Sequence, residues 1–215
     1  CKTINARGKL LSFKKPLIMG ILNMTPDSFF DGGKNKNLEI ALSNVKQMID
    51  DGADIIDIGA YSSRPGAPLI SSQEEIDRSV PIIKHIRAAY PNITLSIDTF
   101  RADVAEATVN AGVDIINDIS GGSIDTNMFA TVARLQVPYI LMHMRGTPET
   151  MQSMTTYNDI VTDISTYFGE KISTLRSLGV KDIILDPGYG FSKTVDQNYE
   201  LLKRVDEFQY LGLPI

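Results

Sequence analysis

The sequence has few of the residues that build disulfide frameworks and metal centres. Its 215 residues include one cysteine, two histidines (His85 and His143) and no tryptophan. A single thiol cannot form an internal disulfide, and so few thiols and imidazoles exclude a cysteine-based zinc site or a histidine-rich metal centre. Together with the absence of a signal-peptide pattern, this scarcity of cysteine predicts a protein of the reducing cytoplasm.

Long apolar runs and an excess of basic charge are also lacking. The mean hydropathy is −0.04, and no apolar run approaches the roughly 18 residues that a membrane-spanning helix needs. The 21 basic residues against 26 acidic ones give a net charge of −5, which argues against a nucleic-acid or anionic membrane partner. A small basic pocket for an anion remains compatible with that balance. The hydrophobic residues, 43% of the chain, suffice for the core of one domain.

Short apolar segments alternate with amphipathic segments of helical length throughout the chain. Three junctions from helix to strand share one pattern, in which Gly52, Gly112 or Gly179 precedes an apolar run. Glycine suits the left-handed position after a helix, so these repeats predict right-handed crossovers and a parallel sheet. The expected strands are residues 16–23, 54–59, 93–98, 114–119, 137–143 and 181–186, with a seventh from Leu213, and the expected helices are residues 38–51, 72–90, 102–111, 126–135, 157–178 and 196–210.

Polar residues stand at the ends of the expected strands, and they decide between two α/β architectures. They are Asn23, Asp57, Asp98, Asn117, His143 and Asp186. The carboxyl ends of parallel strands meet at one edge, so all six are expected on the same rim. An open doubly wound sheet concentrates its polar groups at one switch point, whereas a barrel gathers them from successive strands at its C-terminal face. The pattern therefore favours a TIM-type (β/α)8 barrel over the open sheet.

The length of the chain sets one further expectation. A barrel of this kind takes about 250 residues, and the seventh strand would begin only at Leu213. We therefore expect residues 1–215 to form a single barrel domain whose last strands and helices lie beyond Ile215.

Two expected loops at this rim carry groups suited to a charged ligand. The loop after the first strand contains Phe29 and Asp31, a combination typical of a lid that closes on a ligand. Asn23 at the strand tip offers an amide oxygen for a hard cation such as Mg²⁺. In the second loop, the Ser63 hydroxyl and the Arg64 guanidinium can together grip a phosphate or carboxylate. From the residues alone, two ordinary polar loops with a solvated arginine remain the alternative.

Asp98, Asn117 and Asp186 are the strongest candidates for a binding site. Each ends a run of apolar residues, so each is expected inside the mouth of the barrel, where an unpaired polar group is costly. Two carboxylates and an amide that converge there would accept hydrogen bonds from a flat heterocycle with several N–H donors, such as a pterin. The alternative is that these residues only cap the loops and helices that follow them, as Asp and Asn often do.

Two further strand ends supply sulfur-containing and aromatic side chains. Met142 and Met144 lie on one face of the fifth expected strand, where a thioether can pack on a flat ring, although filling a core is the commoner role of methionine. Residues 186–193 combine glycines with Tyr189 and Phe191, which can wall a ring. No glycine-rich stretch matches a P-loop or a dinucleotide fingerprint, so the sequence supports neither an ATPase nor a nicotinamide enzyme.

With these segments in this order, the sequence resembles the dihydropteroate synthase family of pterin-binding enzymes. The resemblance rests on residues 20–33, 52–67, 96–101 with 112–122, 141–148 and 184–193. It implies a TIM-type barrel that joins 6-hydroxymethyl-7,8-dihydropterin diphosphate to p-aminobenzoate, with release of diphosphate. It further implies Mg²⁺ as cofactor, a homodimer in the cytoplasm, a target of sulfonamides, and no nucleic-acid or membrane partner.

The resemblance also implies roles for individual residues, by position. Asp98, Asn117 and Asp186 match the pterin receptor of the family, and Asn23 matches the residue that holds Mg²⁺ and diphosphate. The implied catalytic set is Asp98, Asn23, Asp31 and Arg64. The other implied contacts are Met142 and Ile119 beside the pterin, Phe29 in the first mobile loop, Ser63 and Pro65 with Arg64 in the second, and Phe191 at the aminobenzoate ring.

The chain departs from the family pattern at several places. Ser63 stands where Thr is common, Tyr61 where Glu is common, and Tyr189 replaces a common Phe. Two family motifs, Ser-Arg-Lys and Arg-x-His, would fall beyond Ile215. Two alternatives therefore stay open: a pterin-binding methyltransferase, which needs no grip on diphosphate, and a non-catalytic pterin-binding protein.

Overall fold

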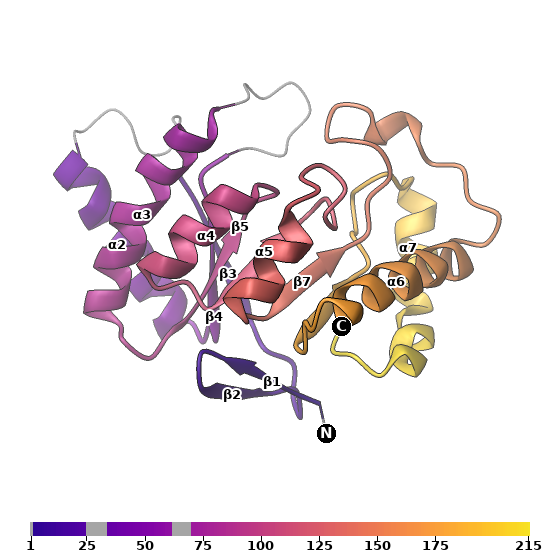
Figure 1. Cartoon of the computed structure of the whole chain (residues 1–215), viewed down its shortest axis with the longest axis horizontal. Helices are drawn as coiled ribbons and strands as arrows, with labels where there is room; N and C mark the ends of the chain where they lie inside the picture. The colour runs from indigo at the N-terminus through magenta and orange to yellow at the C-terminus, as the bar shows by residue number, and fades with distance from the viewer. Residues whose placement is uncertain (1, 25–33, 62–69) are drawn as a thin grey trace.

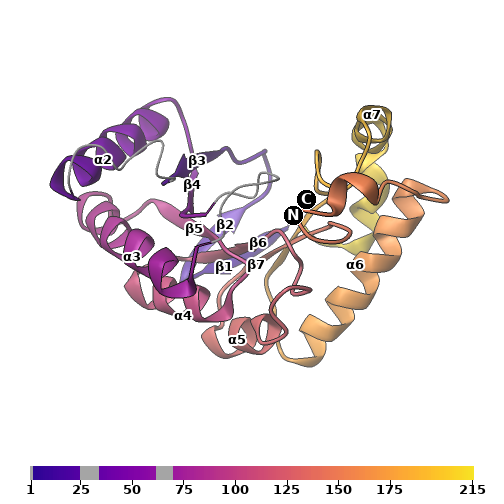
Figure 2. The ribbon, with the colours of Figure 1, turned by 90° about the horizontal axis from the view of Figure 1, so that it is seen from above.

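The computed structural model describes residues 2–24, 34–61 and 70–215, with the backbone alone at residues 34–36. A sheet of six parallel strands curves through the domain, and the connecting helices lie on its outer side, as Figure 1 and Figure 2 show. The strands are β3 (Met19–Asn23), β4 (Ile55–Gly59), β5 (Thr94–Asp98), β6 (Ile115–Asp118), β7 (Tyr139–Met142) and β8 (Ile183–Asp186). The helices are α2 (Lys34–Asp50), α3 (Ser72–Ala89), α4 (Ala102–Ala111), α5 (Met128–Leu135), α6 (Ile160–Ser177) and α7 (Val195–Lys203), with 3-10 turns η1 (Met151–Ser153) and η2 (Val205–Leu211).

The order of the strands in the sheet identifies the architecture. Each strand pairs with the next one along the chain, from β3 to β8, and the order never reverses. A doubly wound sheet has a reversal in its strand order, and its helices cover both faces. Here all six βα units follow one another in one sense around the curve, which is the construction of a (β/α) barrel wall.

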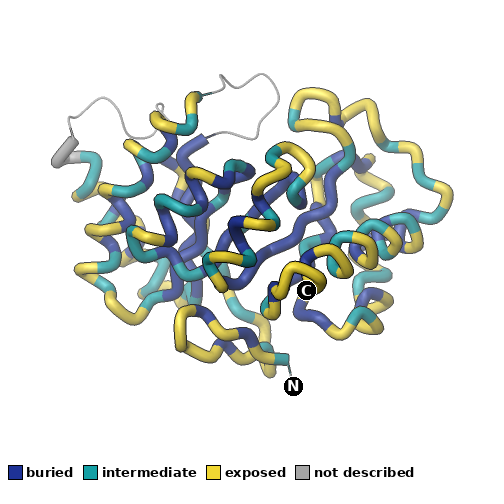
Figure 3. The backbone as a smooth tube through the Cα atoms, viewed as in Figure 1, coloured by how far each residue is buried: buried dark blue, intermediate teal, exposed yellow. Residues whose placement is uncertain are grey.

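The two faces of each strand have different surroundings. Side chains alternate along a strand, and in β4 the side chains of Ile56 and Ile58 belong to the large core between sheet and helices. Asp57 and Gly59 therefore face the concave side. All six strands contribute to that outer core, and Figure 3 shows mostly buried strands beneath helices that are partly exposed. β-branched residues suit such a pleated surface packed under helices.

A short antiparallel hairpin, which the sequence analysis did not predict, closes the lower end of the sheet. It consists of β1 (Thr3–Ala6) and β2 (Lys9–Ser12), joined by two residues with positive φ, Arg7 and Gly8. Two such residues form the type I′ turn that suits a tight hairpin. Ile4, Ala6 and Leu11 pack against the first halves of four parallel strands, at Ile55, Ile115, Ile140 and Ile184 (Figure 1).

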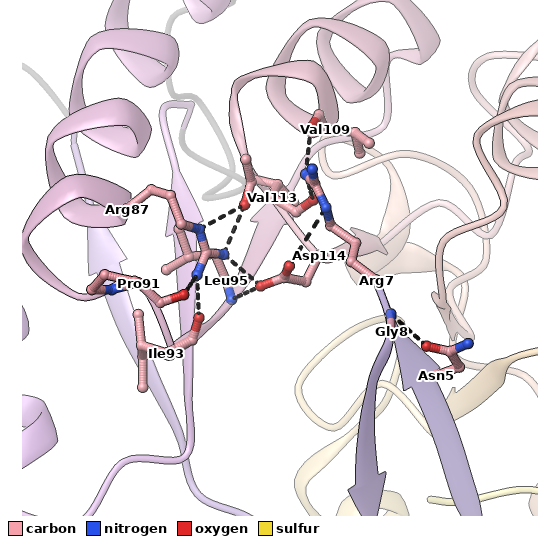
Figure 4. A network of polar contacts seen from close by, with 11 residues as sticks. Asn5, Arg7, Gly8, Arg87, Pro91, Ile93, Leu95, Val109, Val113 and Asp114 are labelled. Carbon is pink, nitrogen blue, oxygen red and sulfur yellow. Dashed lines mark hydrogen bonds and ion pairs between the residues drawn. The ribbon is translucent and has the colours of Figure 1, made fainter.

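Arginine side chains tie this hairpin and α3 to the turn between α4 and β6 (Figure 4). The Arg7 guanidinium donates to the carbonyl oxygens of Val109 and Val113, at 2.8 and 3.1 Å. Arg87 of α3 donates to the carbonyl of Gly112 at 2.7 Å and to Asp114 Oδ2 at 2.6 Å. These bonds give side-chain partners to carbonyls at the end of α4 and in the turn that follows it.

The elements expected from the sequence are present, with differences near the C-terminus. The helix expected over residues 196–210 divides into α7 and η2. The strand expected from Leu213 is not formed as a regular element, but the Leu185 N–H donates to the Pro214 carbonyl at 2.8 Å, so this segment returns to the edge of β8. Among the described residues, no helix combines the length and the apolar character needed to cross a bilayer.

Candidate active site

Four strand ends place one residue each in a row across the concave face. Asn23, Gly59, Asp98 and Asn117 are successive register partners on β3, β4, β5 and β6. A Cβ placed on Gly59 would lie 3.4 Å from Asn23 Oδ1 and 3.6 Å from Asp98 Oδ2. The missing side chain of Gly59 therefore leaves room for the polar groups of its two neighbours to approach each other.

Asp57 lies one layer deeper than this row. The Asn117 Nδ2 group donates to Asp57 Oδ2 at 3.1 Å, which joins the ends of β4 and β6 through their side chains. Asp57 is almost fully buried, whereas Asp98 and Asn117 are partly exposed. Asp57 was expected on the rim but not among the site residues; the available signal was its position in a buried strand, two residues before the end.

Asp186 approaches the same region from the far side of the curve. It is the register partner of Met142, and its Oδ1 accepts the Gly188 N–H at 2.8 Å. Burial is the main cause of the raised pKa of Asp57, and the negative charge of Asp186 raises it further, so the two carboxylates interact across the concave face. Asp57, Asp98, Asn117 and Asp186 are called the acceptor layer below.

The acceptor layer is electrostatically strained and incompletely hydrogen-bonded. Burial is the largest cause of a raised pKa at all three carboxyls; for Asp57 the value is about 6, and the charge of Asp57 raises the pKa of Asp98 further. The hydroxyl of Ser96, the register partner of Asp57, lowers the pKa of Asp57 through a hydrogen bond but does not offset the effect of burial. Asn117 Oδ1 is buried without a hydrogen-bond partner among the described residues. Buried polar atoms of this kind are costly unless something pairs with them. A ligand with several N–H donors would supply those partners.

Apolar side chains bound the acceptor layer above and below. Below it are the isoleucines that pack on the β1–β2 hairpin. Above it is a mouth cluster, defined by Tyr61, Phe100, Ile119, Met142, Met144 and Met151, with Ile70 and Phe191 at its edge. Polar acceptors between two apolar layers fit a flat ring that is apolar on its faces and carries donors on its rim.

A buried lysine holds the loop that follows β8, and the sequence analysis missed it. The Lys193 ammonium donates to the carbonyls of Gly188 and Phe191, each at 2.9 Å, and lies 3.1 Å from His143 Nδ1. Burial lowers the pKa of Lys193 to about 7 and, together with the Lys193 charge, that of His143 to about 3. The imidazole is therefore neutral and can accept a hydrogen bond from the lysine. A lysine at the end of a glycine-rich loop was the available signal.

The structure brings most of the described candidates together. Asp98, Asn117 and Asp186 lie in the acceptor layer, and Ile119, Met142 and Phe191 lie in or beside the mouth cluster. Asn23 is exposed at the rim. The remaining candidates, Phe29, Asp31, Ser63, Arg64 and Pro65, lie outside the described residues.

The neighbouring residue Asp118 shows that position alone does not define the site. It adjoins Asn117 but faces the helices, where its carboxylate accepts from the Tyr139 hydroxyl at 2.7 Å and from the Ser120 and Gly122 N–H groups at 2.8 and 2.9 Å. All its strong partners are internal, so Asp118 stabilises the turn after β6 and takes no part in the acceptor layer.

An acceptor layer at the C-terminal ends of parallel barrel strands defines the class: an α/β-barrel protein with a site for a small heterocyclic ligand. Comparison with known proteins gives the family, because residues 19–215 match the model of the pterin-binding enzymes. The chain is 46% identical over 204 residues to a dihydropteroate synthase of Synechocystis, covering 94% of this chain and 70% of that protein. It therefore belongs to the dihydropteroate synthases of the pterin-binding enzyme family.

Solved structures agree in fold. A dihydropteroate synthase of Yersinia pestis, in complex with a sulfonamide drug, superposes with a TM-score of 0.91 at 40% identity, covering 99% of this chain and 78% of that one. A Xanthomonas albilineans dihydropteroate synthase with 4-aminobenzoic acid gives 0.89 at 35% identity, covering 99% and 76%. The expected α/β barrel class is thereby confirmed.

Proposed function

We propose that this chain joins 6-hydroxymethyl-7,8-dihydropterin diphosphate to p-aminobenzoate, which gives 7,8-dihydropteroate and diphosphate. It is thus a transferase of folate biosynthesis. The observation that carries the proposal is the acceptor layer, in which the buried carboxyls of Asp98 and Asp186 and the unpaired oxygen of Asn117 lie between two apolar layers. The complex of a related enzyme with 4-aminobenzoic acid supports the second substrate.

The acceptor layer would bind the pterin and favour its activation. The ring N–H groups donate to Asp98, Asn117 and Asp186, while its faces contact the mouth cluster. Breakage of the bond between the exocyclic methylene carbon and oxygen leaves positive charge spread into the ring and both bond electrons on diphosphate. Carboxylates fixed beside the ring stabilise that positive charge without reorganising. Burying these carboxylates costs free energy in the free protein, and the stabilisation that they give to the transition state offsets that cost.

The neutral amine of p-aminobenzoate then forms the new bond to the methylene carbon and loses a proton to solvent. An aromatic amine is a weak nucleophile, so orientation supplies much of the rate. Phe191 lies beside the mouth cluster, and its carbonyl accepts a hydrogen bond from Lys193. In this proposal its ring packs on the aminobenzoate ring. Ser63, Arg64 and Pro65, together with Phe29 and Asp31, stay predicted contacts of the two substrates.

Asn23, at the rim, would help to hold Mg²⁺. Asn23 Oδ1 is an exposed hard oxygen beside the acceptor layer, and amide oxygens are accepted ligands of this ion. Within the described residues no group of three or more acidic, cysteine or histidine side chains could hold a metal. An ion at Asn23 would thus take most of its oxygens from diphosphate and water, and it would neutralise charge on the leaving group.

A homodimer and a cytoplasmic location also stay predictions. Exposed apolar residues on one face of α7, namely Val195, Tyr199 and Leu202, support a surface that another protein segment covers. Their spacing of three and four residues places them on one side of the helix.

The activity is tested by mixing the purified protein with both substrates and Mg²⁺ and measuring released diphosphate. Asp98→Asn keeps the size of the side chain but removes the negative charge, and we expect at least a hundredfold loss of kcat/KM, about 3 kcal/mol of transition-state stabilisation. Asp118→Asn is the matched control on the helix-facing side, expected to lower stability while kcat/KM of the folded protein stays within about threefold.

Three results would contradict the proposal. Methyl transfer without diphosphate release would favour a pterin-dependent methyltransferase. Pterin binding without turnover would favour a non-catalytic binding protein. Full activity of an Asp98→Asn variant would mean that the acceptor layer takes no part in the mechanism.

A further inference from the structure

Tyr61 contacts the acceptor layer through its hydroxyl group. It lies two residues beyond Gly59, is 7% exposed, and donates a hydrogen bond to Asp98 Oδ1 at 2.8 Å. Its ring packs edge-on against Phe100, with centroids 5.1 Å apart and an interplanar angle of 81°. The ring is therefore fixed by packing, and the hydroxyl has a fixed direction.

This hydrogen bond divides the two oxygens of Asp98 between different partners. Oδ1 accepts from Tyr61, while Oδ2 is the oxygen that lies toward Gly59 and the concave face. A carboxylate that already holds one donor has fewer rotamers available, so less conformational entropy is lost when a ligand binds the other oxygen. Tyr61 is also one of the positions where this chain departs from the family pattern.

Among the described residues, the Tyr61 hydroxyl is the one hydrogen-bond donor to the Asp98 carboxylate. Burial and the charges of Asp57, Glu75 and Asp118 all raise its pKa, and the Tyr61 hydroxyl is the neighbour that opposes them. Glu75 itself is paired with Arg101 at 2.6 Å, and Asp118 with the Tyr139 hydroxyl. Removing the Tyr61 hydroxyl would take away the one donor that the described residues give this carboxylate, and would leave it among negative groups.

We propose that Tyr61 is a positioning residue for pterin recognition: it holds Asp98 by one oxygen so that the other meets the ring N–H groups of the ligand. The inference rests on the proposed function. It gives Tyr61 a role in pterin binding that Tyr61 exerts through Asp98. Tyr61 itself touches neither the breaking nor the forming bond in this account.

The test compares two tyrosines that make the same kind of contact. Tyr61→Phe deletes the donor to Asp98 and keeps the ring; Tyr139→Phe deletes the donor to Asp118 on the helix-facing side of the sheet. For Tyr61→Phe we expect about tenfold weaker calorimetric binding of 6-hydroxymethylpterin and a matching rise in KM for the pterin substrate, with KM for p-aminobenzoate within about twofold. Tyr139→Phe should lower thermal stability and leave pterin affinity unchanged.

A double-mutant cycle identifies the path through Asp98. In an Asp98→Asn background, Tyr61→Phe should change kcat/KM by less than about twofold, because the group it positions is already altered. Unchanged pterin affinity in Tyr61→Phe, or the same tenfold loss in both backgrounds, would overturn the inference. No pterin binding by the unsubstituted protein would instead overturn the proposed function on which the inference rests.

Discussion

At the scale of single residues, the polar groups of the acceptor layer lower the stability of the free protein while they favour binding of the ligand. Asp57, Asp98 and Asp186 share one partly enclosed face, and burial raises the pKa of each of them. A fold selected for stability alone would replace such groups with apolar ones. Their presence is explained if a ligand supplies the missing donors.

Asp57→Asn should stabilise the free protein, and the gain should depend on pH. The pKa of Asp57 is raised from 3.8 to about 6, so its contribution favours folding below pH 3.8 and is lost as the pH rises through 6. At pH 8 the ionised carboxylate lowers the free energy of unfolding by up to about 3 kcal/mol. Asparagine keeps an acceptor for the Asn117 amide and carries no charge.

Urea unfolding at pH 8 and pH 4 measures this effect. We expect the variant to be more stable than the original protein at pH 8 and to lose that advantage at pH 4, where Asp57 is protonated. An equal change at both pH values would mean that the charge of Asp57 is not what destabilises the layer. Pterin affinity should fall in the same variant, since stability and binding are opposed here.

The site residues could be predicted from the sequence only where a polar side chain stands at the end of an apolar strand. Asp98, Asn117 and Asp186 end apolar strands, and parallel pairing brings them to one rim. The depth of Asp57 and the contact of Tyr61 with Asp98 depend on strand curvature and on packing against Phe100. Neither is encoded in the local sequence pattern.

At the scale of elements, the loop after β8 contains a glycine that leaves no room for a side chain. Gly188 has φ +72°, and a Cβ there would lie 2.1 Å from the His143 carbonyl oxygen. Its N–H also holds Asp186 Oδ1. An added methyl group would therefore displace both the loop and one carboxylate of the acceptor layer.

Gly188→Ala should lower the free energy of unfolding by roughly 3–5 kcal/mol and raise KM for the pterin substrate, because steric overlap adds to backbone strain. Gly190→Ala is the matched control in the same loop: its φ is +83°, but its Cβ would meet no atom of the described residues within 4 Å. The control should cost about 1 kcal/mol, from strain alone. Equal losses in the two variants, measured by urea unfolding, would contradict the steric explanation.

Elements whose apolar residues repeat with a clear helical or strand period could be predicted from the sequence. Elements shaped by contacts with residues far away in the sequence could not. The parallel strands follow directly from their β-branched runs. The hairpin of β1 and β2 was missed because each strand has only four residues and their apolar side chains are few. The helix expected over residues 196–210 ends early at Arg204, which forms ion pairs with Asp159, Glu200 and Glu207.

At the scale of the whole molecule, the hairpin acts as the floor of the concave face. Ile4 is 2% exposed and packs on the strands, whereas Leu10 of the same hairpin is 71% exposed. Ile4→Ala should therefore cost about 3 kcal/mol of unfolding free energy through a buried cavity. Leu10→Ala should stay within about 0.5 kcal/mol.

The KM values for the substrates show whether the β1–β2 hairpin only supports the fold or also takes part in substrate binding. Because the hairpin lies below the acceptor layer and makes no contact with the mouth cluster among the described residues, we expect KM to stay near its original value in both variants. A large rise in KM for Ile4→Ala, measured well below its melting temperature, would show that the floor also positions the acceptor layer.

The central claim is that the acceptor layer binds the rim of a pterin ring, and a crystal structure of the protein with 6-hydroxymethylpterin tests it most directly. The account predicts ring N–H groups within about 3.2 Å of carboxylate or amide oxygens of Asp98, Asn117 and Asp186, with Met142 against one face of the ring. A pterin bound elsewhere, or bound here with those oxygens still unpaired, would contradict it.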